Sequence, residues 1–324
     1  MLTDDQPRVT IAHLPTPLEP LPRLTSRLAG PELWVKRDDQ TGLATGGNKT
    51  RKLEYLVADA LKQEADLLIT CGAAQSNHAR QTAAAAAKFG LDSTLVLRGP
   101  EPPAVQGNLL LDNLLGAEVV WGRGTALDQR MRQVAEEKRS VGRRPYVVPY
   151  GGSNAIGICG YVSALEELLE QCRERDLHFD RIVFASSSGG TQAGLALAAR
   201  ELGYGADILG ISVDLEADSL KDKVALLAMK TAAHLGLIHT FVAEDFSVND
   251  DYLGGGYAVV GDLEREAIAA VAQAEGLLLD PVYTGRAFGG LLDLIRQGAL
   301  DSSERILFWH TGGTGGLFGH ADQL

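Results

Sequence analysis

Short apolar stretches alternate along this chain with glycine-rich or polar loops and with longer helical patterns. Two examples are Leu67–Thr70 followed by the alanine-rich segment Asn77–Phe89, and Arg181–Ala185 followed by Gln192–Leu202. Buried strands that alternate with helices in this way form parallel sheets covered by helices. The sequence therefore predicts an α/β fold with parallel-rich twisted sheets flanked by helices.

The same rhythm continues over most of the chain. The other expected strands are Ser93–Leu97, Glu118–Trp121, Pro145–Val148, Asp207–Val213 and Arg305–Trp309. The other expected helices are Leu53–Lys62, Gly107–Leu115, Leu127–Arg139, Gly157–Cys172, Lys221–Leu235, Leu263–Glu275 and Ala287–Gln297. A chain of 324 residues is long enough for two domains, and it contains no low-complexity linker. We expect two interleaved domains, a small one of residues 52–154 and a large one that combines residues 1–51 with 155–324.

Composition excludes several classes of partner. The net charge is −12, so a nucleic acid is not expected as a partner. Cys71, Cys159 and Cys172 lack the spacing of a metal site, so we expect no metal and buried thiols in a reducing compartment. The polar N-terminus has no signal-peptide core and the apolar runs are too short for a membrane span, which predicts a cytoplasmic protein.

Four polar loops are expected at the end of strands or at the start of helices. In parallel α/β sheets, ligands bind beyond the carboxyl ends of the strands, so these loops are expected to line one cleft. The loops are Cys71–Asn77, Tyr150–Asn154, Ser186–Thr191 and His310–Gly316.

The segment Ser186–Thr191 has the composition of a phosphate-binding loop. Small residues allow backbone N–H groups to approach an anion, and the following helix adds partial positive charge at its N-terminus. No Lys-Ser/Thr pair follows the glycines, so this is not a Walker A loop. The alternative is an ordinary flexible turn with a helix cap.

Lys49 follows two glycines in a turn that precedes an expected helix. A lysine that forms a Schiff base needs a lowered pKa, which burial beside other cations supplies. The alternative is a solvated lysine. The chain lacks a G-x-G-x-x-G after a strand and a G-x-S-x-G elbow, which argues against a nicotinamide oxidoreductase and an α/β-hydrolase.

Four motifs in the same order resemble one family. They are Lys36–Asp39 with Gly46–Glu54, then Gln75–Thr82, Gly189–Gly194 and Asp280–Gly285. Together they resemble the fold-type II enzymes that depend on pyridoxal phosphate (PLP), which are tryptophan synthase β-like. Within these the chain is similar to the D-cysteine desulfhydrase and 1-aminocyclopropane-1-carboxylate (ACC) deaminase family, from about Ile11 to about Phe318.

The resemblance implies a role for particular residues. Lys49 is expected to form the Schiff base and to move the Cα proton. Asn77 and Thr311 would contact the cofactor ring, and Ser188, Gly189, Gly190 and Thr191 would hold its phosphate. Gln75, Ser76 and Asn77 would bind a small amino-acid substrate, Ser76 also being a catalytic candidate. Tyr283 and Tyr257 are expected as active-site tyrosines, although a tyrosine in such a loop often only packs. A homodimer is also implied.

Two positions distinguish the reactions of this family. ACC deaminases carry Glu where Thr284 stands and Leu where Thr311 stands. A carboxylate beside the pyridine nitrogen makes PLP a stronger electron sink than a hydroxyl does. With threonine at both positions the chain resembles a D-cysteine desulfhydrase, which eliminates hydrogen sulfide from D-cysteine and leaves pyruvate and ammonia.

Several alternatives stay open on the sequence. An L-cysteate sulfo-lyase carries the same threonines and needs a cationic pocket for the sulfonate, for which Arg98, Arg123 and Arg286 are candidates that the sequence does not place. ACC deamination and D-serine deamination belong to the same family. A catalytically silent PLP-binding protein is the alternative from a different class.

Overall fold

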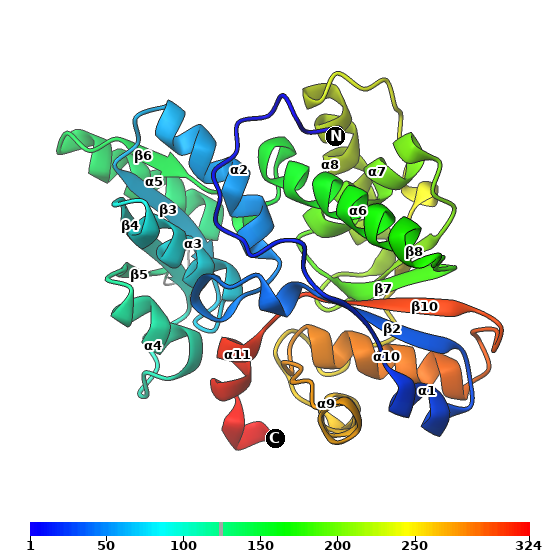
Figure 1. The fold of residues 1–324 in the computed structure, drawn as a ribbon. Coiled ribbons are helices and arrows are strands. Elements are labelled where there is room, and N and C mark those ends of the chain that lie inside the picture. Colours follow the sequence, from blue (N-terminus) through cyan, green and yellow to red (C-terminus); the bar gives the residue numbers. More distant parts are fainter. Residues whose placement is uncertain (123–125) are drawn as a thin grey trace.

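The computed structural model describes residues 1–122 and 126–324, and its strands form two sheets flanked by helices (Figure 1). The larger sheet has the strand order β1-β2-β10-β7-β8-β9. Every neighbouring pair in it is parallel except β1 and β2. The strands are β1 (Leu18–Pro20), β2 (Glu32–Arg37), β7 (Arg181–Ser186), β8 (Asp207–Ser212), β9 (Ser247–Asn249) and β10 (Arg305–His310).

The smaller sheet has the order β5-β4-β3-β6 and is parallel throughout. Its strands are β3 (Leu67–Gly72), β4 (Asp92–Arg98), β5 (Glu118–Gly122) and β6 (Pro145–Val147). All six residues of β3 are buried, as expected for an inner strand covered on both faces. The two sheets confirm the predicted parallel-rich α/β fold.

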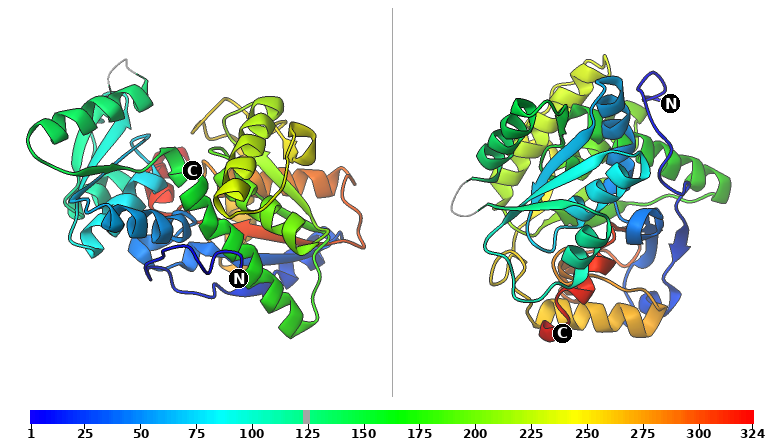
Figure 2. Two further views of the ribbon diagram at one scale, coloured as in Figure 1. Left: turned by 90° about the horizontal axis from the view of Figure 1, so that it is seen from above. Right: turned by 90° about the vertical axis from the view of Figure 1, so that its left-hand side faces the viewer.

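Helices cover both faces of both sheets (Figures 1 and 2). On the larger sheet, α6, α7 and α8 form one apolar layer, and α1, α9 and α10 form the other. On the smaller sheet, α3 and α4 pack on one face and α5 on the opposite face. The helices are α1 (Pro22–Leu28), α2 (Lys49–Lys62), α3 (Asn77–Lys88), α4 (Gly107–Leu114), α5 (Leu127–Ser140), α6 (Ala155–Arg175), α7 (Gly190–Leu202), α8 (Ala217–His234), α9 (Asp262–Glu275), α10 (Thr284–Arg296) and α11 (Thr314–Phe318). Short 3-10 helices are η1 (Asp38–Gln40), η2 (Leu43–Thr45), η3 (Tyr150–Gly152), η4 (Ala243–Asp245) and η5 (Ala321–Gln323).

The chain passes between the sheets twice. The larger sheet takes strands from residues 18–37 and 181–310, and the smaller sheet takes strands from residues 67–147. Helix α2 lies between them and packs against both α6 and α3. The strand order therefore interleaves the two parts, while the expected boundaries at 51/52 and 154/155 stay a prediction.

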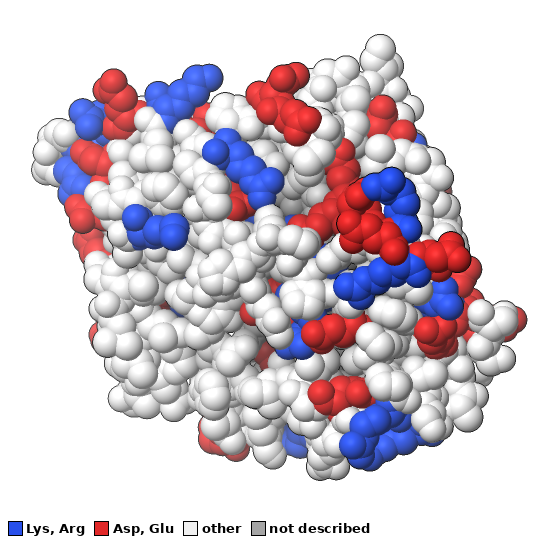
Figure 3. Space-filling model, viewed as in Figure 1, with Lys and Arg blue, Asp and Glu red and all other residues white. Residues whose placement is uncertain are grey.

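Surface charge is mixed on the face drawn in Figure 3. Positive and negative side chains are interspersed there, and that face carries no continuous basic stripe.

Across residues 1–122 and 126–324, no helix is both long enough and apolar enough to cross a membrane.

Candidate active site

One cavity lies where the carboxyl ends of strands from both sheets meet. All four loops expected at this edge contribute to its lining, which confirms that prediction. Of the predicted site residues, the lining contains Lys49, Ser76, Asn77, Ser188, Gly189, Thr191, Tyr257, Tyr283 and Thr311. Gln75 and Gly190 are outside the lining.

Lys49 is the first residue of α2, whereas the sequence placed it on a turn four residues before the helix. The helix begins there because Asn48 is already held, its backbone N–H donating to the Thr311 carbonyl at 2.9 Å. Burial, and then the neighbouring charge of Lys223, lowers the pKa of Lys49 to about 8. A neutral amine is thus accessible near physiological pH, which is the condition for a nucleophilic lysine.

The turn before Lys49 is strained. Ala44, Thr45, Gly46 and Gly47 have φ values of 41°, 71°, 71° and 127°, and positive φ is costly for the two residues that carry a Cβ. Gly47 has no room for a side chain, because a Cβ would lie 2.3 Å from the Gln81 amide nitrogen. The Thr41 hydroxyl holds this glycine, accepting from its N–H at 2.8 Å and donating to its carbonyl at 2.9 Å. Specific contacts therefore hold the turn in its strained conformation.

The loop Ser186–Thr191 connects β7 to α7, as predicted. Gly189 adopts the left-handed conformation, and Gly190 is the first residue of α7. A Cβ on Gly190 would lie 2.5 Å from the Ser153 hydroxyl and 2.8 Å from Lys52 Nζ. Ser153 donates to the Ser188 hydroxyl at 2.9 Å, and Asn48 donates to the Thr191 hydroxyl at 3.2 Å. Hydrogen bonds thus connect this loop both to Asn48, which precedes Lys49, and to the loop after β6.

Three lysines surround this loop. Lys52 is fully buried, and Nζ donates to the Gly151 carbonyl and the Ser153 hydroxyl. Lys223, from α8, donates to the Ser187 carbonyl at 3.3 Å. Burial lowers the pKa of Lys49, Lys52 and Lys223, and the charge of Lys223 lowers those of the other two further.

Among the described residues, no carboxylate acts on Lys49 or Lys52, whereas Asp214 and Asp128 attract Lys223 without forming an ion pair with it. Buried positive charges that repel one another are costly unless an anion compensates them. A small-residue loop, a helix N-terminus and adjacent cations together fit the dianionic phosphate of a cofactor. The residues present therefore fit PLP.

The start of α3 offers a second anion site. Ser76 is the N-cap, its hydroxyl accepting from the Ala79 N–H at 3.1 Å. The first backbone N–H groups of a helix have no partner within the helix and attract an anion. The side chain of Gln75 is turned to α4 instead, where it accepts from the Asn108 N–H at 2.8 Å and donates to the Gln106 carbonyl. Its polar atoms thus hold the start of α4 and lie outside the cavity lining, while its role in substrate binding stays a prediction.

Tyr257 and Tyr283 meet at the cavity wall. Their hydroxyl oxygens are 2.7 Å apart, and their rings are in edge contact with centroids 6.1 Å apart. Burial raises the pKa of both phenols, so both keep their protons at physiological pH. Such a pair can donate a hydrogen bond to a bound molecule through one hydroxyl while the other stabilises it.

Thr284 has a different environment from the one expected beside a pyridine nitrogen. It is fully buried, is outside the cavity lining, and donates its hydroxyl to Asp280 Oδ1 at 2.8 Å. The backbone N–H groups of Val282, Tyr283 and Thr284 also donate to the Asp280 carboxylate. Asp280 lines the cavity and organises the start of α10, whereas Thr311 is the threonine that faces the cavity.

Of the arginines considered for a sulfonate, Arg98 and Arg286 do not line this cavity. Arg286 is fully buried in α10, where it pairs with Glu264 at 2.6 Å and donates to three backbone carbonyls. Arg98 is exposed at the end of β4. Arg123 lies outside the described residues. Among the described lining residues, Lys49 is the one lysine or arginine.

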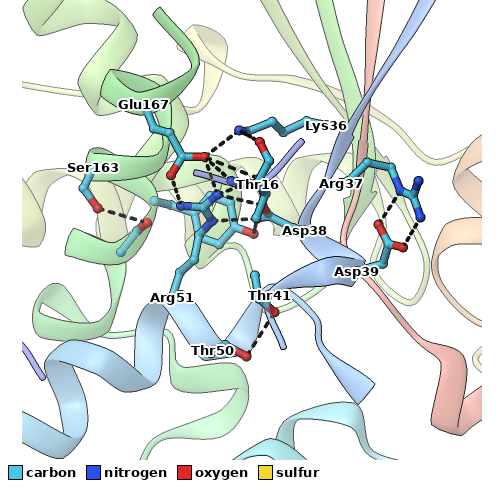
Figure 4. A network of polar contacts seen from close by, with 12 residues as sticks. Thr16, Lys36, Arg37, Asp38, Asp39, Thr41, Thr50, Arg51, Ser163 and Glu167 are labelled. Atoms are coloured by element: carbon cyan, nitrogen blue, oxygen red, sulfur yellow. Dashed lines mark hydrogen bonds and ion pairs between the residues drawn. The ribbon is translucent and has the colours of Figure 1, made fainter. Parts of the chain in front are cut away.

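A buried ion cluster surrounds Arg51, two residues after Lys49 in the sequence (Figure 4). Arg51, in the first turn of α2, donates to Asp38 at 2.8 and 2.9 Å and to Glu167 of α6 at 2.9 Å. Lys36 of β2 also donates to Glu167, and Thr16 bridges to Asp38. Burial opposes ionisation, yet Arg51 lowers the pKa of both carboxyl groups. The cluster fixes the start of α2 against β2 and α6.

Sequence reasoning missed several residues of the cavity. His78, Tyr150 and Asp280 line it, and Lys223 acts on it from α8. Tyr150 lies in a loop that was expected at the cleft, so its position was the available signal. Lys223 lies on a helix with no motif, and only the packing of α8 on Gly189 brings it close.

No cluster of three or more metal-ligating side chains is present in the described ranges.

Comparison with known proteins gives consistent results. The family "Pyridoxal-phosphate dependent enzyme" matches residues 9–312. D-cysteine desulfhydrase of Salmonella typhi is 44% identical over 320 residues, covering 97% of this chain and 96% of its own. The crystal structure of an ACC deaminase homologue superposes with a TM-score of 0.92 at 41% identity, covering 99% of this chain and 96% of its own. The serine racemase of maize, with a TM-score of 0.63 at 19% identity, covers 92% of this chain and 88% of its own and shares the fold.

Proposed function

The chain belongs to the pyridoxal-phosphate-dependent enzymes, and on that premise we propose that it eliminates hydrogen sulfide from D-cysteine to give pyruvate and ammonia. Support comes from the named relatives, which are D-cysteine desulfhydrases. Further support comes from a cavity whose polar groups match the three needs of this reaction: a base at Cα, an anion site for the carboxylate, and an acid for the leaving group.

In this proposal the cofactor is held at both ends. Ser188, Gly189, Gly190 and Thr191 bind the phosphate, Asn77 and Thr311 lie beside the ring, and Lys49 binds the aldehyde carbon. When bound, PLP supplies the electron sink that makes the Cα proton of an amino acid removable. Lys52 and Lys223 add positive charge on two sides of the phosphate loop.

Once the amino group of the substrate has replaced it at the aldehyde carbon, the released amine of Lys49 would take the proton from Cα. Its lowered pKa, caused by burial and by Lys223, allows a neutral amine that can accept a proton. The strained turn and the ion cluster of Arg51 fix the start of α2, so the amine is directed into the cavity without a large loss of side-chain entropy.

Ser76 and Asn77 orient the substrate. Its carboxylate would lie at the N-terminus of α3, where backbone N–H groups and the Ser76 hydroxyl favour a negative charge. One phenol of the Tyr257–Tyr283 pair then gives a proton to the departing sulfur. Both phenols stay protonated until then because their pKa is raised by burial.

The position of Lys49 is the observation that carries the proposal, because it is the one lysine or arginine among the described residues that line the cavity. Borohydride reduction of the PLP-bound protein should tag Lys49, and Lys49→Ala should abolish both the tag and pyruvate release. A tag on another lysine would refute the assignment. Bound PLP without pyruvate release from any tested amino acid would instead support the silent binding protein.

We further propose a homodimer in the cytoplasm. The homodimer is supported by the family resemblance, and a reducing compartment is supported by three buried free thiols at Cys71, Cys159 and Cys172. Light scattering of the purified protein at several concentrations should give twice the mass of one chain, and a monomer at all concentrations would refute the homodimer.

A further inference from the structure

Arg80 is a buried arginine that has no assigned role. It lies one turn after Asn77 in α3 and is 0% exposed. Nε donates to Asn108 Oδ1 at 3.1 Å, and Nη2 donates to Asn77 Oδ1 at 3.3 Å. Nη1 donates to the carbonyls of Ala44 and Gly46. No carboxylate pairs with it within 4.0 Å in the described part of the chain, so its hydrogen bonds to neutral oxygens must hold it in place.

Two of these bonds reach the strained turn before Lys49. Ala44 and Gly46 both have positive φ, and their carbonyl oxygens converge on one guanidinium nitrogen. The Gln81 amide also donates to the Gly46 carbonyl at 2.9 Å. A turn with several residues at positive φ persists only where the surrounding contacts outweigh its strain. The guanidinium group of Arg80 is the charged member of those contacts.

The other two bonds determine how two amide groups are oriented. A guanidinium group only donates hydrogen bonds, so the atom of Asn108 that faces Arg80 must be its oxygen. The Asn108 nitrogen is then free to donate to Asn77 Oδ1, which it does at 2.9 Å. Asn77 Oδ1 thus receives two donors, one from each residue.

This arrangement leaves the nitrogen of the Asn77 amide group for a ligand. Asn77 lines the cavity, and its oxygen is occupied on the side of Arg80. An amide group that presents N–H to the cavity binds an oxygen anion, whereas one that presents its oxygen repels it. The orientation of a single amide group therefore decides whether Asn77 attracts or repels a negatively charged oxygen.

We propose that Arg80 is the positioning residue of this site: it clamps the strained turn that carries Lys49, and it orients Asn77 so that N–H groups face the cofactor. Arg80 does not touch the reacting atoms and acts through its neighbours. The proposal rests on the proposed function in one respect, namely that PLP lies beside Asn77. It does not depend on which amino acid is the substrate.

Arg80→Lys tests the clamp, because lysine keeps the positive charge and lacks the planar fork that reaches four oxygens. Three properties should change. The dissociation constant of PLP should rise at least about tenfold, since an oriented hydrogen bond to a charged oxygen is lost. The absorbance maximum of bound PLP should shift. Hydrogen exchange of residues 41–50 should be faster than in the parent protein.

Val271→Ala is the control for lost stability. Val271 is buried in α9 among apolar side chains of the larger sheet, away from the cavity lining. It should lower the melting temperature without changing the absorbance of PLP or the exchange of residues 41–50. If Arg80→Lys changes PLP binding no more than Val271→Ala does at an equal loss of melting temperature, the proposal is refuted.

Asn77→Asp tests the amide orientation while leaving Arg80 intact. It replaces the N–H groups by a second carboxylate oxygen, so PLP affinity should fall by at least as much as in Arg80→Lys. Parent-like PLP affinity and absorbance in Asn77→Asp would overturn the proposal even if Arg80→Lys does not fold. Failure of D-cysteine turnover would contradict the proposed function alone, since these readouts need no substrate.

Discussion

At the scale of single residues, Asp112 is unusual because it is fully buried and its two carboxylate oxygens lack partners among the described residues. Burial raises its pKa to about 7, against the smaller opposing effect of Arg80. The folded protein therefore binds a proton that the unfolded chain releases at about pH 4. This contribution to stability is present below about pH 4 and is lost as the pH rises through 7.

We expect Asp112→Asn to be more stable than the parent protein at pH 8 and to differ little from it at pH 4. Each pKa unit corresponds to about 1.4 kcal/mol, so the gain at pH 8 has an upper limit of about 4 kcal/mol. Urea unfolding at both pH values measures the difference, with PLP saturating throughout. An equal difference at the two pH values would mean that the proton is not the cause.

Thr191 gives a second prediction at this scale. Thr191→Ala removes a hydroxyl from the proposed phosphate loop, so PLP binding should weaken by about 1.5–3 kcal/mol, the range for hydrogen bonds to charged groups. Thr231→Ala is the matched control, since Thr231 is a buried threonine whose hydroxyl donates to the Leu227 carbonyl within α8. Equilibrium dialysis should show weaker retention of PLP in the first variant only. Unchanged retention in Thr191→Ala would argue that the phosphate lies elsewhere.

At the scale of elements, the ion cluster of Arg51 determines how α2 sits on α6 (Figure 4). Glu167 accepts from both Arg51 and Lys36, and removing one partner of a buried ion pair leaves the other charge uncompensated. Glu167→Gln should therefore lower the free energy of unfolding at pH 7 by about 3 kcal/mol. Because the pKa of Glu167 is lowered in the folded protein, the difference from the parent protein should shrink as the pH falls through that pKa.

Glu166→Gln is the matched control one position earlier on α6. Glu166 has no Lys or Arg partner in the described ranges: one carboxylate oxygen accepts from the Leu2 N–H and the other is buried without a partner. Burial raises its pKa, so removing the charge should cost little at pH 7. Denaturant unfolding should separate the two variants, and an equal loss in both would show that the cluster does not fix α2.

Pattern reasoning predicted most strands and helices, but it missed the six-residue β2 and the helix α1. The buried β3 and β7 and the alanine-rich α3 have strong apolar patterns, and their bounds came within two residues of the prediction. The short β1 and β9 have three residues each, too few for an alternation to be visible. The start of α2 was misplaced because backbone contacts from Thr311 determine it, and no local pattern encodes such contacts.

The same distinction applies to the site. Loops that follow strands were predictable, because the carboxyl ends of parallel strands meet at one edge. Gln75 and Thr284 belong to the motifs, but their side chains bind other parts of the protein. Only the packing of α4 and α10 shows these contacts. Lys223 and Arg80 act across elements far apart in the sequence, so no spacing rule points to their partners.

At the scale of the whole molecule, one cavity receives loops from both sheets, and we expect its charges to select the substrate. Lys49 is the single lysine or arginine among the described lining residues. In the proposed reaction it binds the cofactor and serves as the base, so it is not available to pair with a sulfonate. A sulfonate in this cavity would lose its hydration and find no further lysine or arginine among the described lining residues, which is costly, whereas the thiol of D-cysteine is neutral. We therefore expect kcat/KM for D-cysteine to exceed that for L-cysteate by at least about 100-fold, or about 2.7 kcal/mol. A pyruvate assay with both substrates measures this ratio, and a preference for L-cysteate would refute the substrate assignment while leaving Lys49 chemistry intact.

We expect discrimination against ACC to depend on the contacts of Thr284. Its hydroxyl lies 2.8 Å from Asp280 Oδ1, so Thr284→Glu would place a second carboxylate beside a buried one. Two carboxylates at such a distance cannot both ionise, and the start of α10 that carries Tyr283 would be disturbed. The Thr284→Glu, Thr311→Leu double variant should thus lose D-cysteine activity, and a gain of ACC deamination would require Asp280 to adjust as well. Assays of 2-oxobutanoate from ACC and pyruvate from D-cysteine, in the parent protein and in both single variants, separate these effects. Equal efficiency of the parent protein on the two substrates would contradict the assignment, because the threonines would then set no barrier to ring opening.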